Sequence, residues 1–236
     1  MDISIIIPFK DECERIEMSL NEVRSYFNSR GISYEIILVD DGSLDNATTQ
    51  IIEPLLTDKR ILLLKHKKNL GKGAAIATGV NASHGDYIFF TDADLSTPIS
   101  EFEKLYAKRL TRLVIGTRTD EKLIKTKQPF FRIFFGKLGN LVIRYLLGLS
   151  YKDTQCGFKL FDAQLAKELF SRLIIARWGF DFEVLFKARQ KGVLATEIPV
   201  IWSHKGKSKL IPIVDHVRSL YELFYFRICY FIENKR

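Results

Sequence analysis

Apolar runs typical of strands alternate with segments typical of helices through the first half of the sequence, and this alternation constrains the fold more than any other feature. The strand-like runs cover residues 3–8, 34–39, 61–65, 87–91 and 113–116. Between the first two runs, the apolar spacing of an amphipathic helix is carried by Ile16, Leu20, Val23 and Phe27. Strands that alternate with such helices form βαβ units. The pattern predicts an α/β fold with a mostly parallel sheet covered by helices on both faces.

Polar clusters follow three of the predicted strands. They are Pro8-Phe9-Lys10-Asp11-Glu12, Asp40-Asp41-Gly42-Ser43 and Asp92-Ala93-Asp94. In open α/β sheets, ligands bind beyond the carboxyl ends of the strands. We therefore expect the three clusters to meet at one edge of the sheet and to form a ligand site there.

The cluster Asp92-Ala93-Asp94 ends a buried strand with two carboxylates separated by one small residue. Two carboxylates and the oxygens of a bound diphosphate are hard ligands of the kind that Mg²⁺ or Mn²⁺ prefers. Aspartate is also common in turns, so a simple turn after the strand is the alternative interpretation.

The segment 69–75, Asn-Leu-Gly-Lys-Gly-Ala-Ala, lies between a predicted strand and a predicted helix. Its glycines allow close backbone approach, the helix N-terminus offers N–H groups to an anion, and Lys72 carries a positive charge. The alternative is a glycine-containing loop that begins a helix. At the second polar cluster, we expect Asp40 to contact a base or ribose and Asp41 to be partly structural.

Composition indicates a globular protein with an anionic partner. The 236 residues can form one α/β domain, and 36 Lys and Arg against 28 Asp and Glu give a net charge of +8. A nucleotide or an acidic membrane surface fits this charge better than nucleic acid, since no nucleic-acid-binding motif is present. Three widely spaced cysteines predict reduced thiols and a cytoplasmic location, and we expect no N-terminal signal peptide.

Two aromatic, basic segments stand out in the second half, residues 128–149 and 213–232. Neither has the ~20 uninterrupted apolar residues that a spanning helix needs. Their mixture of aromatic and basic side chains predicts amphipathic helices that lie in a membrane interface. Packing in the core or in a dimer contact is the alternative. We divide the chain into a catalytic domain, residues 1–210, and a C-terminal amphipathic helix, residues 211–236.

In their order and spacing, the motifs IPFKDE, VDDGS, NLGKGAA and DAD resemble those of family 2 glycosyltransferases. The later motifs GTR at 116–118, DTQCGFKLF at 153–161 and GKSK at 206–209 resemble the polyprenyl-phosphate branch of that family, above all the dolichyl-phosphate β-glucosyltransferases, with the mannose synthases as close kin. The resemblance implies the GT-A fold, a Rossmann-like α/β arrangement, over about residues 3–210.

The resemblance also implies a donor site with a divalent cation, Mg²⁺ or Mn²⁺. The donor nucleotide would be held by Pro8, Glu12, Asp40, Lys72 and Asp92. Asp94 would bind the metal, with Asp92 at the ribose or as a second ligand. Two residues depart from the family pattern, because Asp11 replaces the usual Asn and Ser96 stands where mannose synthases often have Gln.

For the acceptor, the resemblance implies cationic side chains that align two anions. The residues concerned are Arg118, Lys205, Ser208 and Lys209, and the need to align two anions adds Arg132 as a further cationic candidate. A phosphate monoester is already largely dianionic at neutral pH, because its second pKa is about 6, so it needs little help from a base. Asp153 is the candidate base, with a turn cap as the alternative. Catalytic roles thus fall on Asp94, Arg118 and Asp153.

The predicted function is an inverting transfer of glucose from UDP-glucose to a polyprenyl phosphate at the cytoplasmic face of a membrane. GDP-mannose or a UDP-N-acetylhexosamine is the alternative donor, and a polysaccharide hydroxyl is the alternative acceptor. A nucleotide-sugar-binding scaffold without activity is a further alternative, which the intact Asp92, Asp94, Lys72 and Arg118 argue against.

Overall fold

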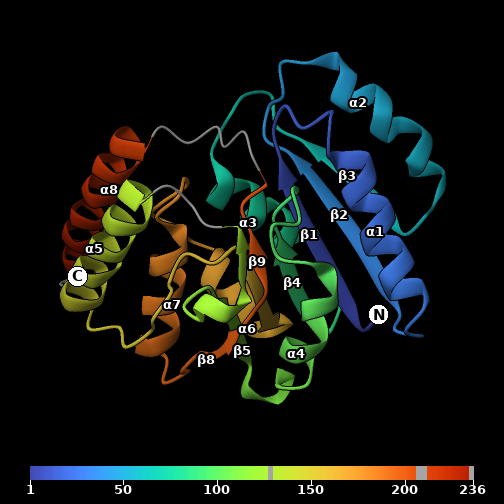
Figure 1. The fold of residues 1–236 in the computed structure, drawn as a ribbon. Helices are drawn as coiled ribbons and strands as arrows, with labels where there is room; N and C mark the ends of the chain where they lie inside the picture. Colours follow the sequence, from blue (N-terminus) through green and yellow to red (C-terminus); the bar gives the residue numbers. More distant parts are fainter. Residues whose placement is uncertain (127–129, 206–211, 234–236) are drawn as a thin grey trace.

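The computed structural model describes residues 1–126, 130–205 and 212–233. A seven-stranded sheet forms its centre, with the strand order β3-β2-β1-β4-β7-β5-β8 (Figure 1). The strands are β1 (Ile3–Phe9), β2 (Tyr34–Asp40), β3 (Ile61–Lys65), β4 (Tyr87–Thr91), β5 (Leu113–Thr117), β7 (Phe158–Asp162) and β8 (Thr196–Pro199). All neighbours are parallel except β7, which is antiparallel to both β4 and β5. The predicted α/β fold with a mostly parallel sheet is confirmed.

Helices cover both faces of this sheet. Their bounds are α1 (Ile16–Asn28), α2 (Asn46–Ile52), α3 (Lys72–Ala82), α4 (Phe102–Tyr106), α5 (Phe130–Leu147), α6 (Ala163–Phe170), α7 (Phe180–Gln190) and α8 (Pro212–Glu233). Side chains alternate along β1, so that Ile5 and Ile7 join one buried cluster and Ile6 joins the other. The cluster with Ile5 packs under α1 and α4, and the cluster with Ile6 packs under α3, α6 and α7.

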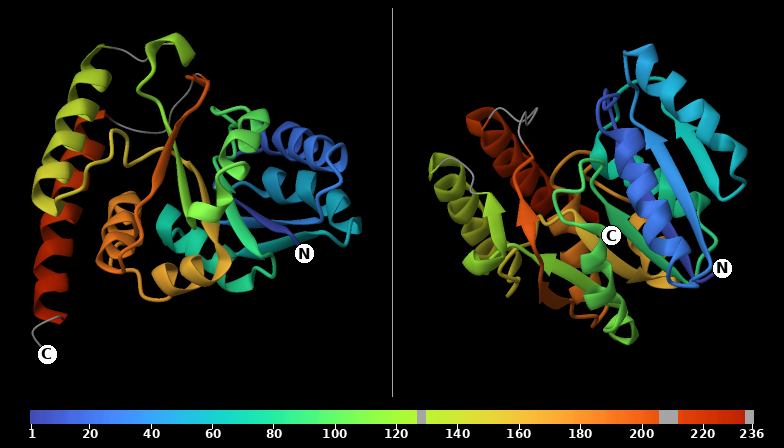
Figure 2. Two further views of the ribbon diagram at one scale, coloured as in Figure 1. Left: turned by 90° about the horizontal axis from the view of Figure 1, so that it is seen from below. Right: turned by 45° about the vertical axis from the view of Figure 1, so that its right-hand side comes forward.

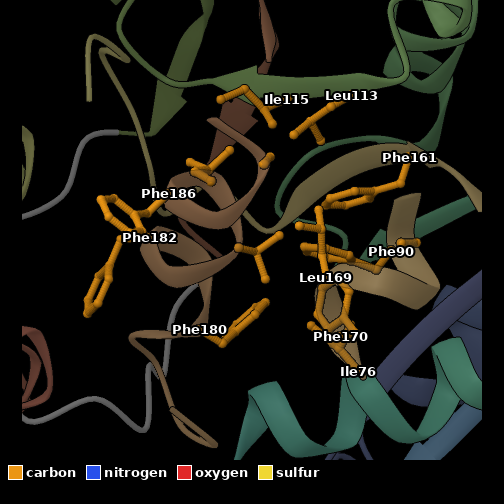
Figure 3. Close-up of a cluster of buried hydrophobic side chains, with 14 of the residues drawn as sticks. Ile76, Phe90, Leu113, Ile115, Phe161, Leu169, Phe170, Phe180, Phe182 and Phe186 are labelled. Carbon is orange, nitrogen blue, oxygen red and sulfur yellow. The ribbon is translucent and has the colours of Figure 1, made fainter. Parts of the chain in front are cut away.

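The cluster on the α3, α6 and α7 side is rich in phenylalanine (Figure 3). Phe90 of β4 stacks on Phe161 of β7 with ring centroids 5.9 Å apart, and Phe180 of α7 lies 6.0 Å from Phe90. Such rings combine large buried area with favourable edge or offset contacts. The aromatic packing holds α7 against the antiparallel strand, and it thereby brings the start of α7 close to the carboxyl edge of β4.

Helices α5 and α8 lie side by side and project away from the sheet (Figures 1 and 2). Phe226 of α8 packs against Phe182 and Phe186 of α7, and Leu223 joins the same buried cluster. Across the described residues, no helix is both long and apolar enough to cross a bilayer. The division at residue 210 stays a prediction. A small second sheet pairs β6 (Ile124–Thr126) with β9 (Trp202–Ser203).

Candidate active site

The predicted ligand loops meet at the carboxyl edge of the parallel strands. Asp40 ends β2, Asp92 follows β4, and Arg118 follows β5. The segment that leads into β7 reaches the same edge, because β7 runs in the opposite direction to its neighbours. Residues 153–157 therefore lie between the ends of β4 and β5, beside both Asp92 and Arg118.

Lys72 and Asp92 form an ion pair at the centre of this edge. The ammonium Nζ of Lys72, the first residue of α3, lies 2.5 Å from Oδ1 of Asp92. Burial alone would lower the pKa of Lys72, but nearby carboxylates, above all Asp92 and Asp181, outweigh burial and raise it. Lys72 is therefore a fixed positive charge, and its partner Asp92 keeps a side chain that is 40% exposed to a ligand.

Gly157 fits closely against Asp92. A Cβ atom at this glycine would fall 2.6 Å from Cγ and Oδ1 of Asp92 and closer still to Oδ2, so the carboxylate would have to shift. The absence of a side chain at Gly157 therefore gives the carboxylate of Asp92 its place. This contact explains why a glycine stands in the motif 153–161.

Asp94 lies two residues further and accepts two hydrogen bonds from Ser96. Its Oδ1 accepts from the backbone N–H of Ser96 and its Oδ2 from the hydroxyl, both at 2.8 Å. Ser96, which departs from the mannose synthase pattern, thus orients the predicted metal ligand. Among the described residues, no group of three His, Cys, Asp or Glu side chains could hold a metal ion. Asp94 and Asp92 still fit Mg²⁺ or Mn²⁺ with a bound diphosphate, because Mg²⁺ is often held by one or two carboxylates and substrate phosphates.

Asp40 and Asp41 make different contacts. Asp41 accepts hydrogen bonds from the backbone N–H groups of Leu70 and Gly71, each at 2.8 Å, and lies 2.8 Å from Nδ1 of His66. Its structural role is confirmed, because it holds the loop that precedes Lys72. Asp40 is buried and accepts a hydrogen bond from the N–H of Ser43, and its contact with a nucleoside stays a prediction.

The N-terminus of α3 differs from the expectation. The N–H of Gly73 donates to the carbonyl of Arg177 at 3.2 Å, and the N–H of Ala74 donates to the carbonyl of Ala176 at 2.9 Å. The prediction that these helix N–H groups are free for an anion is therefore wrong. The loop before α7 caps the helix instead, and the side chain of Lys72 remains as the cationic group of this segment.

Arg118 and Asp153 form a second ion pair at the edge. The guanidinium donates through Nε at 2.7 Å and through Nη2 at 2.9 Å to the two carboxylate oxygens. Burial alone would raise the pKa of Asp153, but Arg118 outweighs it and holds that pKa below its usual value. The ring of Trp202 lies 5.8 Å from the guanidinium carbon of Arg118. Asp153 therefore orients Arg118, and its predicted role as a base stays a prediction.

The structure shows fewer contacts for the other predicted site residues. Pro8 is buried near the end of β1, and Glu12 lies 3.8 Å from Arg15. Lys205 is exposed shortly after β9, and Arg132 lies on α5. Ser208 and Lys209 lie outside the described residues.

Three residues at this edge escaped the sequence analysis. Lys159 of β7 and Asp181 of α7 form a buried ion pair beneath the loops, and the indole of Trp178 lies 5.4 Å from Nζ of Lys72. A signal for the pair was present, because both charges stand within aromatic, apolar runs. No comparable pattern marks Trp178.

Comparison with known proteins identifies the class. The family model described as "Glycosyl transferase family 2" matches residues 4–170, so the chain belongs to this family. It is a glycosyltransferase with the GT-A fold.

Relatives narrow the similarity further. The dolichyl-phosphate beta-glucosyltransferase ALG5C of Trichomonas vaginalis is 37% identical over 88% of this chain and 65% of its own length. The dolichyl-phosphate beta-glucosyltransferase of Homo sapiens is 32% identical over 97% of this chain and 75% of its own length. The chain thus spans between about two thirds and three quarters of these relatives.

Solved structures agree on the fold. Glucosyl-3-phosphoglycerate synthase from Mycobacterium tuberculosis, in complex with Mn²⁺, UDP-glucose and phosphoglyceric acid, superimposes with a TM-score of 0.69. That match covers 96% of this chain and 79% of the other, with 18% sequence identity.

Proposed function

We propose that this chain transfers glucose from UDP-glucose to dolichyl phosphate or another polyprenyl phosphate, with inversion at the anomeric carbon. The observation that carries the proposal is the meeting of the Lys72–Asp92 and Arg118–Asp153 pairs at one edge of the sheet. Relatives named for this reaction are 31–37% identical, which supports the same donor and acceptor.

The donor end of the reaction is assigned to Lys72, Asp92 and Asp94. A sugar–nucleotide bond breaks with charge building on the departing diphosphate, and fixed positive charge stabilises that charge. Lys72 supplies one such charge. A divalent cation, when bound at Asp94 with Asp92, neutralises the diphosphate further. Mn²⁺ in the complexes of the mycobacterial synthase with UDP is in line with this assignment.

The acceptor end is assigned to Arg118. A guanidinium suits phosphate because its planar fork can donate two parallel hydrogen bonds. A hydroxyl acceptor would need a base, and the lowered pKa of Asp153 makes that carboxylate a weak one. A phosphate acceptor needs no strong base, which favours the lipid phosphate over a polysaccharide hydroxyl. Arg132, Lys205, Ser208 and Lys209 are proposed to complete the phosphate site.

Helices α5 and α8 are assigned to the membrane. Apolar side chains that are exposed to solvent gather on both helices: Leu138, Leu141, Tyr145, Tyr221, Phe224, Tyr225, Ile228, Phe231 and Ile232. Large exposed apolar surface rarely occurs on a monomer without a partner. We assign this surface to monotopic contact with the cytoplasmic face of a bilayer, where a polyprenyl phosphate would be reached.

The donor and acceptor are tested with radiolabelled nucleotide sugars, a short-chain polyprenyl phosphate, and Mg²⁺ or Mn²⁺. We expect transfer from UDP-glucose to the lipid, lost on chelation and in Asp94→Asn. The matched control is Asp58→Asn, which removes a carboxylate before β3 at the opposite edge of the sheet. Transfer from GDP-mannose or UDP-N-acetylglucosamine instead would show that the proposed donor is wrong. If no sugar is transferred to the polyprenyl phosphate, the proposed acceptor is refuted.

The membrane contact is tested by flotation with liposomes that contain anionic lipid. We expect the chain to float, and we expect Phe224→Glu with Ile228→Glu on α8 to weaken flotation. Leu110→Glu is the matched control, because Leu110 is an exposed apolar residue on neither helix. Equal flotation of the α8 variant and the control would refute the assignment of α8.

A further inference from the structure

A buried ion pair lies directly beneath the donor edge. The ammonium of Lys159 on β7 contacts Oδ1 of Asp181, in the first turn of α7, and the side chains are only 1% and 4% exposed. Lys159 also donates to the carbonyl of Cys156 at 2.6 Å, and the ring of Phe90 lies 5.4 Å from its Nζ. Two charges are thus enclosed by the phenylalanine cluster on the α3, α6 and α7 side.

Fold stability does not account for such a pair. Burial of two charges carries a large desolvation cost, and apolar residues of similar volume often serve stability as well or better. Phenylalanine and other apolar residues already fill the surroundings of Lys159 and Asp181. We therefore look for a role of the pair in the donor site next to it.

The electrostatics connect the pair to the donor edge. The starts of α3 and α7 are in contact, because a Cβ at Gly73, next to Lys72, would lie 2.7 Å from Cβ of Phe180, next to Asp181. At this short range the carboxylate of Asp181 helps to raise the pKa of Lys72, while burial raises the pKa of Asp181 and the ammonium of Lys159 opposes that rise. The charges of Lys159, Asp181, Lys72 and Asp92 alternate in sign, so each has opposite charge nearby. Lys159 in addition holds the carbonyl of Cys156, the residue before the glycine that receives Asp92.

Ligand binding at Asp92 changes the balance of charge among these four side chains. Asp92 is the direct partner of Lys72, and it is also the residue assigned to the ribose or the cation. When Asp92 turns to a ligand, Lys72 loses part of its neutralising partner, and a poorly solvated ammonium is costly without nearby negative charge. Asp181 cannot be drawn away in the same manner, because it is enclosed and held by Lys159.

We propose that Asp181, held by Lys159, is a positioning residue that keeps Lys72 directed at the donor diphosphate while Asp92 binds its ligand. The inference rests on the proposed role of Lys72 at the diphosphate. Neither Asp181 nor Lys159 touches the reacting atoms in this account. Their effect passes through Lys72 and through the backbone beside Gly157.

The test separates positioning from stability with a double variant. Asp181→Asn leaves Lys159 buried without its anion and lowers stability. Lys159→Met together with Asp181→Asn removes both charges, so stability should recover towards that of the unaltered chain. Binding of UDP and of GDP with Mn²⁺, measured by calorimetry, should remain about tenfold weaker, as is typical when a supporting residue around a binding site is lost.

A second readout does not depend on any nucleotide. Acetylation of Lys72 by acetic anhydride, followed by mass spectrometry and normalised to exposed Lys125, reports how firmly the ammonium is held. We expect faster acetylation of Lys72 in the double variant. Ser4→Ala is the control for lost stability, because Ser4 hydrogen-bonds Glu35 at 2.6 Å near the amino end of β1. It should leave both readouts unchanged.

The outcomes distinguish the two proposals. Recovered stability with unaltered nucleotide binding and unaltered Lys72 acetylation would overturn the positioning role. If the unaltered chain binds neither nucleotide, the proposed donor fails, and the acetylation of Lys72 alone decides the inference. Should the double variant not fold, Asp181→Glu is used for both readouts, because it keeps a carboxylate as the partner of Lys159 but moves that carboxylate by one methylene relative to Lys72.

Discussion

Substitution of Gly157 by alanine separates the folding of this protein from its chemistry. The new Cβ would lie 2.6 Å from Cγ and Oδ1 of Asp92 and closer still to Oδ2, where an ordinary contact needs at least 3.4 Å. The carboxylate must therefore move by roughly 1 Å, if it moves directly away. That movement is open to it, because the Asp92 side chain is 40% exposed.

The expected loss of stability is small. Gly157 has no positive φ, so alanine can adopt its backbone conformation. Alanine in place of glycine restricts the unfolded chain and contributes about 0.4–1 kcal/mol of stability, which offsets the displacement of one flexible side chain. The free energy of unfolding, measured with urea, should therefore change by less than about 1 kcal/mol.

The expected loss of activity is large. Asp92 is the partner of Lys72 and a proposed ligand of the donor, and a misplacement of about 1 Å at such a group can cost on the order of 100-fold. This factor in kcat/KM corresponds to about 2.7 kcal/mol in the activation free energy. Transfer kinetics over a range of UDP-glucose concentrations measure it.

A matched control is available on α5. A Cβ at Gly139 would meet no atom within 4 Å, so Gly139→Ala should retain activity. The reasoning is refuted if Gly157→Ala keeps the kcat/KM of the unaltered chain, or if it unfolds the protein before Asp92 can adjust.

Of three further predictions, two concern contacts at the carboxyl edge of the sheet and one concerns a contact away from it. Arg118→Lys should lower kcat/KM by about 100-fold in the transfer assay, because an ammonium cannot replace the two-pronged bond to Asp153. Asp41→Asn should cost about 1–3 kcal/mol in urea unfolding and raise the donor KM, because one of two backbone N–H groups loses its acceptor. Hydrogen bonds from Arg60 lower the pKa of Asp58 from 3.8 to about 2, so this carboxylate stabilises the fold above its unfolded pKa, and the contribution is lost as the pH falls from 3.8 to about 2. In Asp58→Asn, that part of the acid-induced loss should vanish from unfolding curves recorded across this range. If the measured value does not change in one of these assays, the role assigned to the corresponding contact is wrong.

The parallel half of the sheet could be predicted because each strand is an uninterrupted apolar run. β1, for example, is buried along its whole length, and its predicted bounds differ from the observed ones by one residue. β7 is not among the predicted strands, since its sequence Phe-Lys-Leu-Phe-Asp contains a lysine within the strand. That lysine is tolerated only because Asp181, from another element, neutralises it. A pairing between distant charges leaves no periodicity in the sequence.

The meeting of the three acidic clusters at one edge of the sheet could also be predicted, because the carboxyl ends of parallel strands lie together. The capping of α3 could not be predicted in the same way, since it depends on backbone groups. The carbonyls of Ala176 and Arg177 satisfy the N–H groups of α3, and the N–H of Gly179 donates to Oε2 of Glu222 on α8 at 2.8 Å.

The loop 174–179 thus joins two distant parts of the chain through its main chain. One side of it fixes the helix that begins with Lys72, and the other side is hydrogen-bonded to a carboxylate of α8. Glu222 is buried, and burial raises the pKa of its carboxyl group. An acid among the aromatic residues of α8 looks like an interruption of a membrane segment when only the sequence is read. In the fold, its bond to Gly179 gives it a defined place, because a buried N–H group without an acceptor would be costly.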